Sequence, residues 1–208
     1  MFLFNMSESN YNFFVIAAVV AAKLDQATKI AQRLTLTACN ARAVALRAGE
    51  GAAGFRPLTD YIDRLANVTV SSSLAINKLA SNVSKTAADK FRADNAISRF
   101  NEVYIKAENY PHINSLSKGY LRTEKIQTSL LASYKRQLTQ LIMELDTLED
   151  ELRTALILAT LSRVEASQAG ELYQEALNNV ANNVESAASL IKIQIKESQQ
   201  LVFSLRQE

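Results

Sequence analysis

The chain has 208 residues, which is enough for one domain with a hydrophobic core or for one elongated bundle. Only two prolines and five glycines occur, there is no tryptophan, and the formal net charge is +2 with both signs interspersed. This composition predicts an all-helical protein, and it gives no basic face that would indicate nucleic acid as a partner.

The amino-terminal segment contains the longest apolar run, residues 13–22. A helix needs about 20 apolar residues to cross a bilayer, so this run predicts burial at the base of a bundle, with a weak membrane anchor as the alternative. The start of the chain lacks the basic region of a signal peptide. Cys39 is the single cysteine, which excludes an internal disulfide and fits a reducing compartment. We expect a cytoplasmic protein.

Two helices and a turn are predicted first. Helical spacing extends from about Asn12 to Ala48, a break follows at residues 49–57, and Pro57 suits the first turn of the second helix. The apolar or small stripe expected on the first helix is Ile30, Leu34, Thr37, Ala41, Val44 and Ala48. That on the second helix is Leu58, Ile62, Leu65, Ile76, Leu79 and Val83, followed by Ile97, Phe100, Tyr104 and Ala107.

A loop with a proline, two asparagines and a glycine is predicted at residues 109–119. The helix after it has the strongest periodicity in the chain, with alternating gaps of three and four at Leu131, Tyr134, Leu138, Leu141, Leu145, Leu148, Leu152 and Ala155. A last helix follows Gly170 and carries Leu177, Val180, Val184, Ala187, Ile191, Leu201 and Leu205, with Gln194 and Ser198 as polar interruptions.

These elements predict one elongated unit over residues 1–208, a long antiparallel four-helix bundle made of two consecutive hairpins. Hairpin one is expected at 12–108 with its tip at 49–56, and hairpin two at 120–207 with its tip at about 167–171. The middle helices look longer than the outer ones, so the hairpins should lie side by side with both tips at one end.

The first tip carries a distinctive motif. Asn40, Ala41, Ala45, Arg47, Ala48, Gly49, Glu50, Gly54 and Phe55 match the pattern N-A-A-I-E-A-A-R-A-G-E-x-G-R-G-F, and Ile30, Ala31, Leu36, Ala38, Ile62, Leu65 and Ala66 extend the match without a gap. This segment resembles the tip of the cytoplasmic signalling hairpin of bacterial chemotaxis receptors, the methyl-accepting chemotaxis proteins.

A weaker copy of the motif lies at the second tip. Leu158, Ala159, Glu165, Ala166, Ala169, Gly170 and Glu171 match the same pattern, with Ile157 and Val164 as conservative replacements. The chain is therefore interpreted as an internal repeat, although Ala, Glu and Gly are common enough in helices to align by chance. One chain would then supply both hairpins that two receptor chains normally supply, and we expect a monomer.

The resemblance implies that the tip is a protein contact surface. In the family it meets the coupling protein, the histidine kinase and the tips of other receptors. The candidate contact residues are Leu36, Asn40, Arg47, Glu50, Gly54, Phe55 and Glu165, of which Gly54 and Phe55, like Gly49, could instead shape the turn. Several family positions differ, since Arg33, Val44, Ala53, Tyr61 and Asp63 replace Gln, Glu, Arg, Glu and Arg.

Catalysis and metal binding have little support. His112 is the only histidine and lies beside Pro111 in the predicted loop, so a Glu-x-x-His di-metal site and a Cys/His site are not expected. The glycines at 49–54 lack the Lys-Ser/Thr of a phosphate-binding loop. We expect a chemoreceptor-like signalling or scaffolding protein with no enzymatic activity, metal or cofactor. The alternative is a diverged helical interaction module that has lost the array partners.

Overall fold

The computed structural model describes the backbone of residues 2–107 and 110–205, and the side chains of residues 15–107 and 110–205. Four long helices dominate it: α1 (Phe2–Arg47), α2 (Phe55–Lys106), α3 (Ser117–Gln168) and α4 (Glu171–Ser204). Two short 3-10 helices, η1 (Gly49–Ala52) and η2 (Ile113–Leu116), lie in the first two connections. No strand occurs in the described ranges, and the prediction of an all-α four-helix bundle is confirmed.

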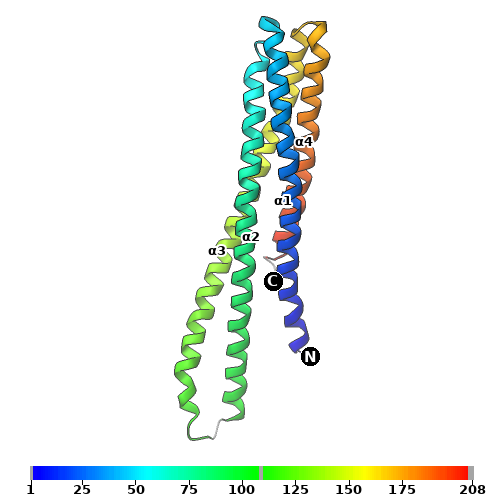
Figure 1. The fold of residues 1–208 in the computed structure, drawn as a ribbon. Helices are drawn as coiled ribbons and strands as arrows, with labels where there is room; N and C mark the ends of the chain where they lie inside the picture. Colours follow the sequence, from blue (N-terminus) through cyan, green and yellow to red (C-terminus); the bar gives the residue numbers. More distant parts are fainter. Residues whose placement is uncertain (1, 108–109, 206–208) are drawn as a thin grey trace.

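The helices form a square in cross-section. Each helix packs against the next one in the chain, and α1 also packs against α4, so that α1 and α3 lie at diagonal corners. Both hairpin turns lie at the same end of the molecule (Figure 1). At the other end α2 and α3 continue past the described ends of α1 and α4 as a two-helix arm, because α1 has 46 residues and α4 has 34, where α2 and α3 have 52 each.

Every helix buries one seam whose positions alternate by three and four residues, which is the pattern of antiparallel coiled-coil packing. The seams are Val20, Leu24, Ala27, Ala31, Leu34, Ala38, Ala41 and Ala45 in α1; Phe55, Thr59, Ile62, Ala66, Thr69, Ser73, Ile76, Ala80, Val83 and Ala87 in α2; Tyr134, Leu138, Leu141, Leu145, Leu148, Leu152, Ala155, Ala159, Ser162 and Ala166 in α3; and Leu177, Ala181, Val184, Ala188, Ile191, Ile195, Ser198, Val202 and Leu205 in α4.

The two hairpins bury equivalent positions. Adding 121 to the number of any seam residue of α1 gives the number of a seam residue of α3, from the pair Val20 and Leu141 to the pair Ala45 and Ala166. An offset of 122 relates α2 to α4 in the same way, from Phe55 and Leu177 to Val83 and Leu205. The first offset is also the one that aligns the two tip motifs in sequence. The two hairpins therefore bury their helices in the same register, and the internal repeat in sequence stays a prediction.

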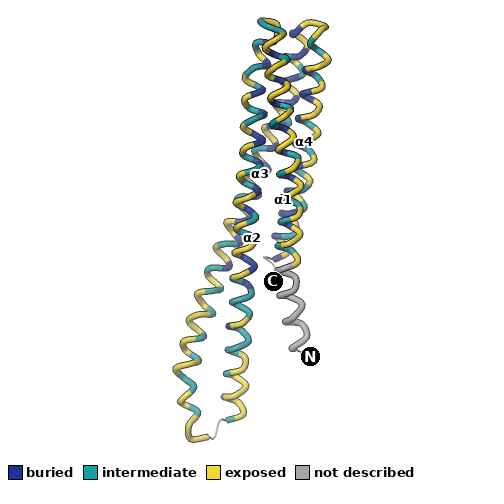
Figure 2. The backbone as a smooth tube through the Cα atoms, in the orientation of Figure 1, coloured by how far each residue is buried: buried dark blue, intermediate teal, exposed yellow. Residues whose placement is uncertain are grey.

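The four-helix core stops where the α2 and α3 seams become polar. Lys90 and Asp94 occupy the next seam positions of α2 and form an ion pair of 2.8 Å, and the Gln127 side chain of α3 donates to the Asp94 carboxylate at 2.7 Å. Burying these groups under two further helices would leave charges without water, which is unfavourable. The arm is accordingly mostly half-buried or exposed along its length (Figure 2).

Several helix limits differ from those expected from the sequence. Helix α1 begins at Phe2 instead of near Asn12, and α2 begins at Phe55, which places Pro57 in its first turn. Helix α3 begins at Ser117, inside the expected 109–119 loop, of which Asn109 lies outside the described residues. Gly119 is therefore helical. Its missing side chain makes room for Phe100, whose Cζ would lie 3.2 Å from an added Cβ.

The seam of α1 also differs from the expected stripe. Leu34 and Ala41 are buried as predicted, and the other seam residues around them are Ala31, Ala38 and Ala45. The remaining predicted residues are only half-buried at the edge of the seam: Ile30, Thr37, Val44 and Ala48. At the tip end the α3 seam residues Ala155, Ala159, Ser162 and Ala166 are small as well. Small side chains on both seams allow helices to pack closely.

Candidate functional site: the paired hairpin tips

The first turn is an irregular link between α1 and α2. Gly49 ends α1 with a φ of +65°, in the left-handed region where a side chain is unfavourable. The 3-10 turn of η1 follows, closed by the Ala53 amide donating to the Glu50 carbonyl at 3.2 Å. The Arg56 side chain donates to the Gly49 carbonyl at 3.4 Å, which joins the start of α2 to the end of α1.

The second turn is much tighter. Only residues 169 and 170 separate α3 from α4, and Gly170 adopts φ +82° and ψ +153°, a conformation that is almost restricted to glycine. Its carbonyl accepts from the Tyr173 and Gln174 amides at 3.0 Å each. Both tips therefore depend on one glycine with positive φ, although the links differ in length.

The two tips are packed against each other. A Cβ added to Gly54 would lie 1.9 Å from Oε2 of Glu165, and one added to Gly51 would lie 3.5 Å from the Gln168 carbonyl oxygen. The Glu165 carboxylate thus occupies the space above Gly54, the residue that precedes α2. An anion is stabilised there by the unpaired amides and the dipole of the helix N-terminus. The structure brings together two predicted site residues, Gly54 and Glu165, from different hairpins.

Phe55 is a core residue. It is 0% exposed, while Ala52 in η1 and Ala169 at the second turn are also buried. The aromatic ring fills the space that the small tip residues leave, so it cannot contact a partner directly. Of the two roles considered for Phe55, the structure places it in the one that shapes the turn.

The remaining predicted contact residues lie on the surface of the first tip. Leu36 is 67% exposed, and Asn40, Arg47 and Glu50 are exposed as well. All four belong to α1 or to η1, whereas Glu165 is half-buried on α3. The exposed part of the predicted site is therefore a feature of hairpin one.

Further outward residues extend this surface, and the motif comparison did not single them out. Cys39 and Ala43 are exposed, and Leu46 is 60% exposed. Together with Leu36 they form an apolar stripe with gaps of three, four and three, which we call the outward seam. The spacing that identifies buried seams could also have revealed the outward seam in the sequence. Leu36, Cys39 and Ala43 each lie two residues before a buried seam residue, Ala38, Ala41 and Ala45 respectively.

The outward seam has a basic border. Between Gln26 and Gly49 the chain has four cationic residues, Lys29, Arg33, Arg42 and Arg47, and no carboxylate. Arg42 is bound to Asp60 of α2 at 2.6 Å. Among the residues that the structure describes, Arg33 and Arg47 have no carboxylate partner within ion-pair distance. With Asn40 they lie at i, i+7 and i+14, on one edge of the seam.

Polar contacts hold the four helices in this arrangement away from the tip. Lys23 of α1 pairs with Glu197 of α4, and Arg163 of α3 pairs with Glu185 of α4. Ser198, next to Glu197, is fully buried in the α4 seam.

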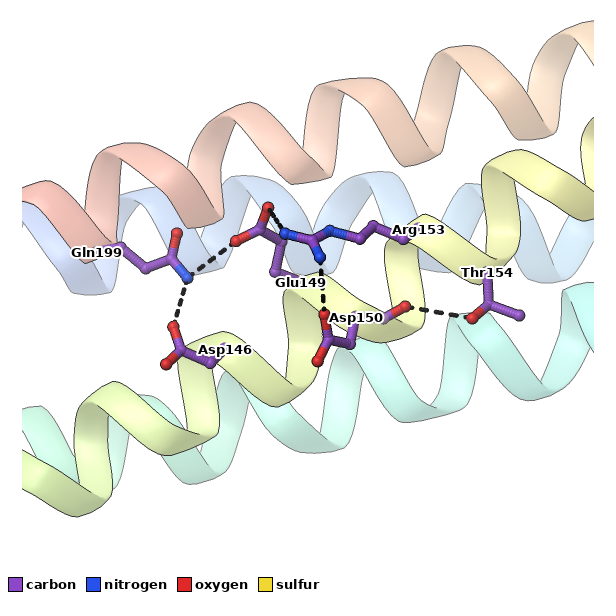
Figure 3. A network of polar contacts seen from close by, with 6 residues as sticks. All are labelled: Asp146, Glu149, Asp150, Arg153, Thr154 and Gln199. Atoms are coloured by element: carbon purple, nitrogen blue, oxygen red, sulfur yellow. Dashed lines mark hydrogen bonds and ion pairs between the residues drawn. The ribbon is translucent and has the colours of Figure 1, made fainter.

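A network around Glu149 joins α3 to α4 (Figure 3). The Gln199 amide donates to Glu149 at 3.1 Å and to Asp146 at 2.8 Å, and Arg153 pairs with Glu149 at 3.2 Å. Burial alone would raise the pKa of the Glu149 carboxyl. The hydrogen bonds from Gln199 and Arg153, with the charges of Arg153 and Lys196, outweigh burial and hold that pKa below its ordinary value.

Other chemistry has little structural support. No group of three or more His, Cys, Asp or Glu side chains that could hold a metal occurs among the described residues. None of the described helices is long and apolar enough to cross a membrane. His112 is exposed near η2, at the far end of the arm from the tips. A groove of about 500 Å³ on the arm is lined by Ala96, Phe100 and Leu116, with Arg92 and Arg99 beside them.

Comparison with family models, with curated proteins and with solved structures found no match to this chain. The resemblance to the chemoreceptor tip therefore stays a prediction that is supported by the motif residues alone.

Proposed function

We propose that this chain is a receptor-like signalling or scaffolding protein that meets components of a chemosensory array through the first hairpin tip. The observation that supports this function is the exposed group Leu36, Asn40, Arg47 and Glu50, at the end of the bundle where the two motif-bearing turns meet. Its partners would be the coupling protein, the histidine kinase or receptor tips. The chain would act in the cytoplasm, without catalysis of its own.

The proposed protein is a monomer built like a receptor dimer. Two hairpins from one chain bury each other's seams, and both hairpins bury equivalent positions. Burying one Leu or Val side chain contributes roughly 1.5 to 3 kcal/mol, so a chain that covers its own seams has lost the main driving force for pairing with a second copy. A native mass near twice 23.0 kDa would contradict this part of the proposal.

The alternative is a diverged helical module that keeps the hairpin scaffold and has lost the array partners. Two observations favour it. Phe55 is buried, and the family's Glu and Arg positions are occupied by Val44 and Ala53. Such a module would bind an unrelated protein along the bundle.

Titration of the purified chain with the coupling protein and with the kinase regulatory domain of the same organism tests these functions against each other. We expect saturable binding that is weakened by Arg47→Glu and unchanged by Ile157→Glu. Ile157 is a suitable control because it is the α3 residue equivalent to Leu36. Absence of binding to both proteins at high micromolar concentration would exclude them as partners and favour the diverged module.

A further inference from the structure

The outward seam has the geometry of a coiled-coil surface that lacks its partner helix. Leu36 and Ala43 lie two residues before the buried Ala38 and Ala45, which places them on the opposite side of α1. Cys39 and Leu46 complete the three-and-four spacing of a seam. Because Cys39 and Ala43 are small, a second helix can approach α1 closely between the two leucines.

The charges beside this seam specify what kind of helix fits. In coiled coils, the positions that flank the apolar seam form interhelical ion pairs and select the partner. Here one edge of the seam has Arg33, Asn40 and Arg47, one heptad apart, and neither arginine is in an ion pair within the described chain. On the other edge Arg42 is bound to Asp60 of α2. We infer that the outward seam of α1 docks an acidic amphipathic helix of a partner protein, with carboxylates that meet Arg33 and Arg47.

The corresponding corner of α3 distinguishes this occupant from the equivalent corner of a second copy of the chain. Ile157, Leu161 and Val164 are 62%, 49% and 53% exposed at the same level of the bundle. The residues of α3 equivalent to Arg33, Asn40 and Arg47 are Thr154, Leu161 and Gln168, none of which carries a charge. A second copy that presented its α3 corner would leave both arginines unpaired. The inference rests on the proposed function in one respect, that this end of the bundle is a protein contact surface.

Cys39 provides a local readout, because it is the only cysteine and lies exposed within the seam. The probe is a synthetic helix of about three heptads with Leu at the seam positions and Glu at the flanking ones, and the matched control has Lys in place of Glu. Like charges keep each peptide from pairing with itself. The expected result is a saturable slowing of Cys39 alkylation by the Glu peptide, and apparent affinity about tenfold lower for the Lys peptide.

Variants of both corners make the test specific. The double change Arg33→Glu with Arg47→Glu is expected to reverse the preference, so that the Lys peptide protects Cys39 better. The matched double change Ile157→Glu with Val164→Glu on α3 should leave protection by the Glu peptide unchanged. All four side chains are exposed, so the circular dichroism spectra and thermal unfolding temperatures of the variants should remain close to those of the wild type.

Four results would overturn the inference. These are an alkylation rate that the Glu peptide leaves unchanged at several hundred micromolar, equal protection by both peptides, protection that grows with protein concentration alone, and protection by anionic vesicles of phosphatidylglycerol. The third result would identify a second copy as the occupant, and the fourth a lipid surface. Binding of the coupling protein or kinase domain without Cys39 protection by the Glu peptide would retain the proposed function and remove this inference.

Discussion

The two hairpins bury the same set of positions but present different surfaces. Leu36 and Ile157 are equivalent outward residues with nearly equal exposure, 67% and 62%. Beside them, hairpin one has Arg33 and Arg47 where hairpin two has Thr154 and Gln168. Core packing restricts which residues can occupy the inward-facing positions of the two hairpins. The outward-facing positions are free to differ, so a protein built of two similar hairpins can carry one specific contact surface instead of two.

The turns of the two hairpins also differ, although both lie at the same end of the bundle. Hairpin one uses a long link with a 3-10 turn and a buried Phe55, while hairpin two uses Gly170 and places Leu177 at the position equivalent to Phe55. The larger side chain belongs to the tip with the longer link, and both side chains are fully buried. Four pairs of substitutions can break or sharpen this comparison.

The largest effect is expected for Phe55→Ala. Removing a fully buried aromatic side chain costs about 3–5 kcal/mol in free energy of unfolding, because it loses transfer free energy and leaves a cavity. Leu177→Ala should cost about 2–4 kcal/mol by the same mechanism. Urea denaturation of both variants measures the difference. A loss below about 1 kcal/mol for Phe55→Ala would mean that the ring does not fill the tip.

The next effect separates the two turn glycines. Gly170→Ala is expected to cost about 2–3 kcal/mol, because its φ and ψ lie in a region that side chains rarely adopt. Gly49→Ala should cost about 1–2 kcal/mol, the penalty of an ordinary left-handed residue. Thermal unfolding checks the order, and equal losses would show that the short turn is no more restrictive than the long one.

A smaller, pH-dependent effect is expected for Glu149→Gln. The equivalent residue in hairpin one is Thr28, so only hairpin two has a buried carboxylate at this level. Losing the charged hydrogen bonds should cost about 1–2 kcal/mol at pH 7. Since the folded pKa of Glu149 is lowered, its contribution is complete above the unfolded pKa and is lost as pH falls through the folded one.

Urea midpoints measured for the wild type and Glu149→Gln between neutral and acidic pH test that sign. The stability difference between the two proteins should shrink as the pH falls. A difference that stayed constant or grew on acidification would contradict the lowered pKa. Asp146→Asn serves as the control, because Asp146 accepts from Gln199 but is exposed.

The smallest effect concerns the contact between the tips. Glu165→Ala should cost about 0.3–1 kcal/mol, since it removes a carboxylate from the N-terminus of α2. Gly54→Ala should displace the same carboxylate, so the double variant should be little less stable than either single one. A double-mutant cycle by chemical denaturation measures this coupling, and additive losses would mean that Glu165 and Gly54 act independently.

The sequence by itself determined the fold class, the number of helices and the α3 seam. From Tyr134 to Ala155 the predicted seam positions are all buried, because large leucines at alternating gaps of three and four have only one face on which they can be buried together. Leu131, the first predicted position, is 37% exposed and lies beyond the four-helix core. The glycines at 49 and 170 also identified both turns, because these turns require positive φ.

Only the tertiary structure decided the α1 register, the role of Phe55 and the contact between the tips. Thr37 and Ala38, or Val44 and Ala45, are adjacent residues that can each be buried in a helix seam, so the apolar pattern cannot choose between them until α2 and α4 are in place. Phe55 is fully buried in the core that the two hairpins share. Glu165 reaches Gly54 because the tertiary structure joins the two turns, and such long-range contacts leave no periodic signal in the chain.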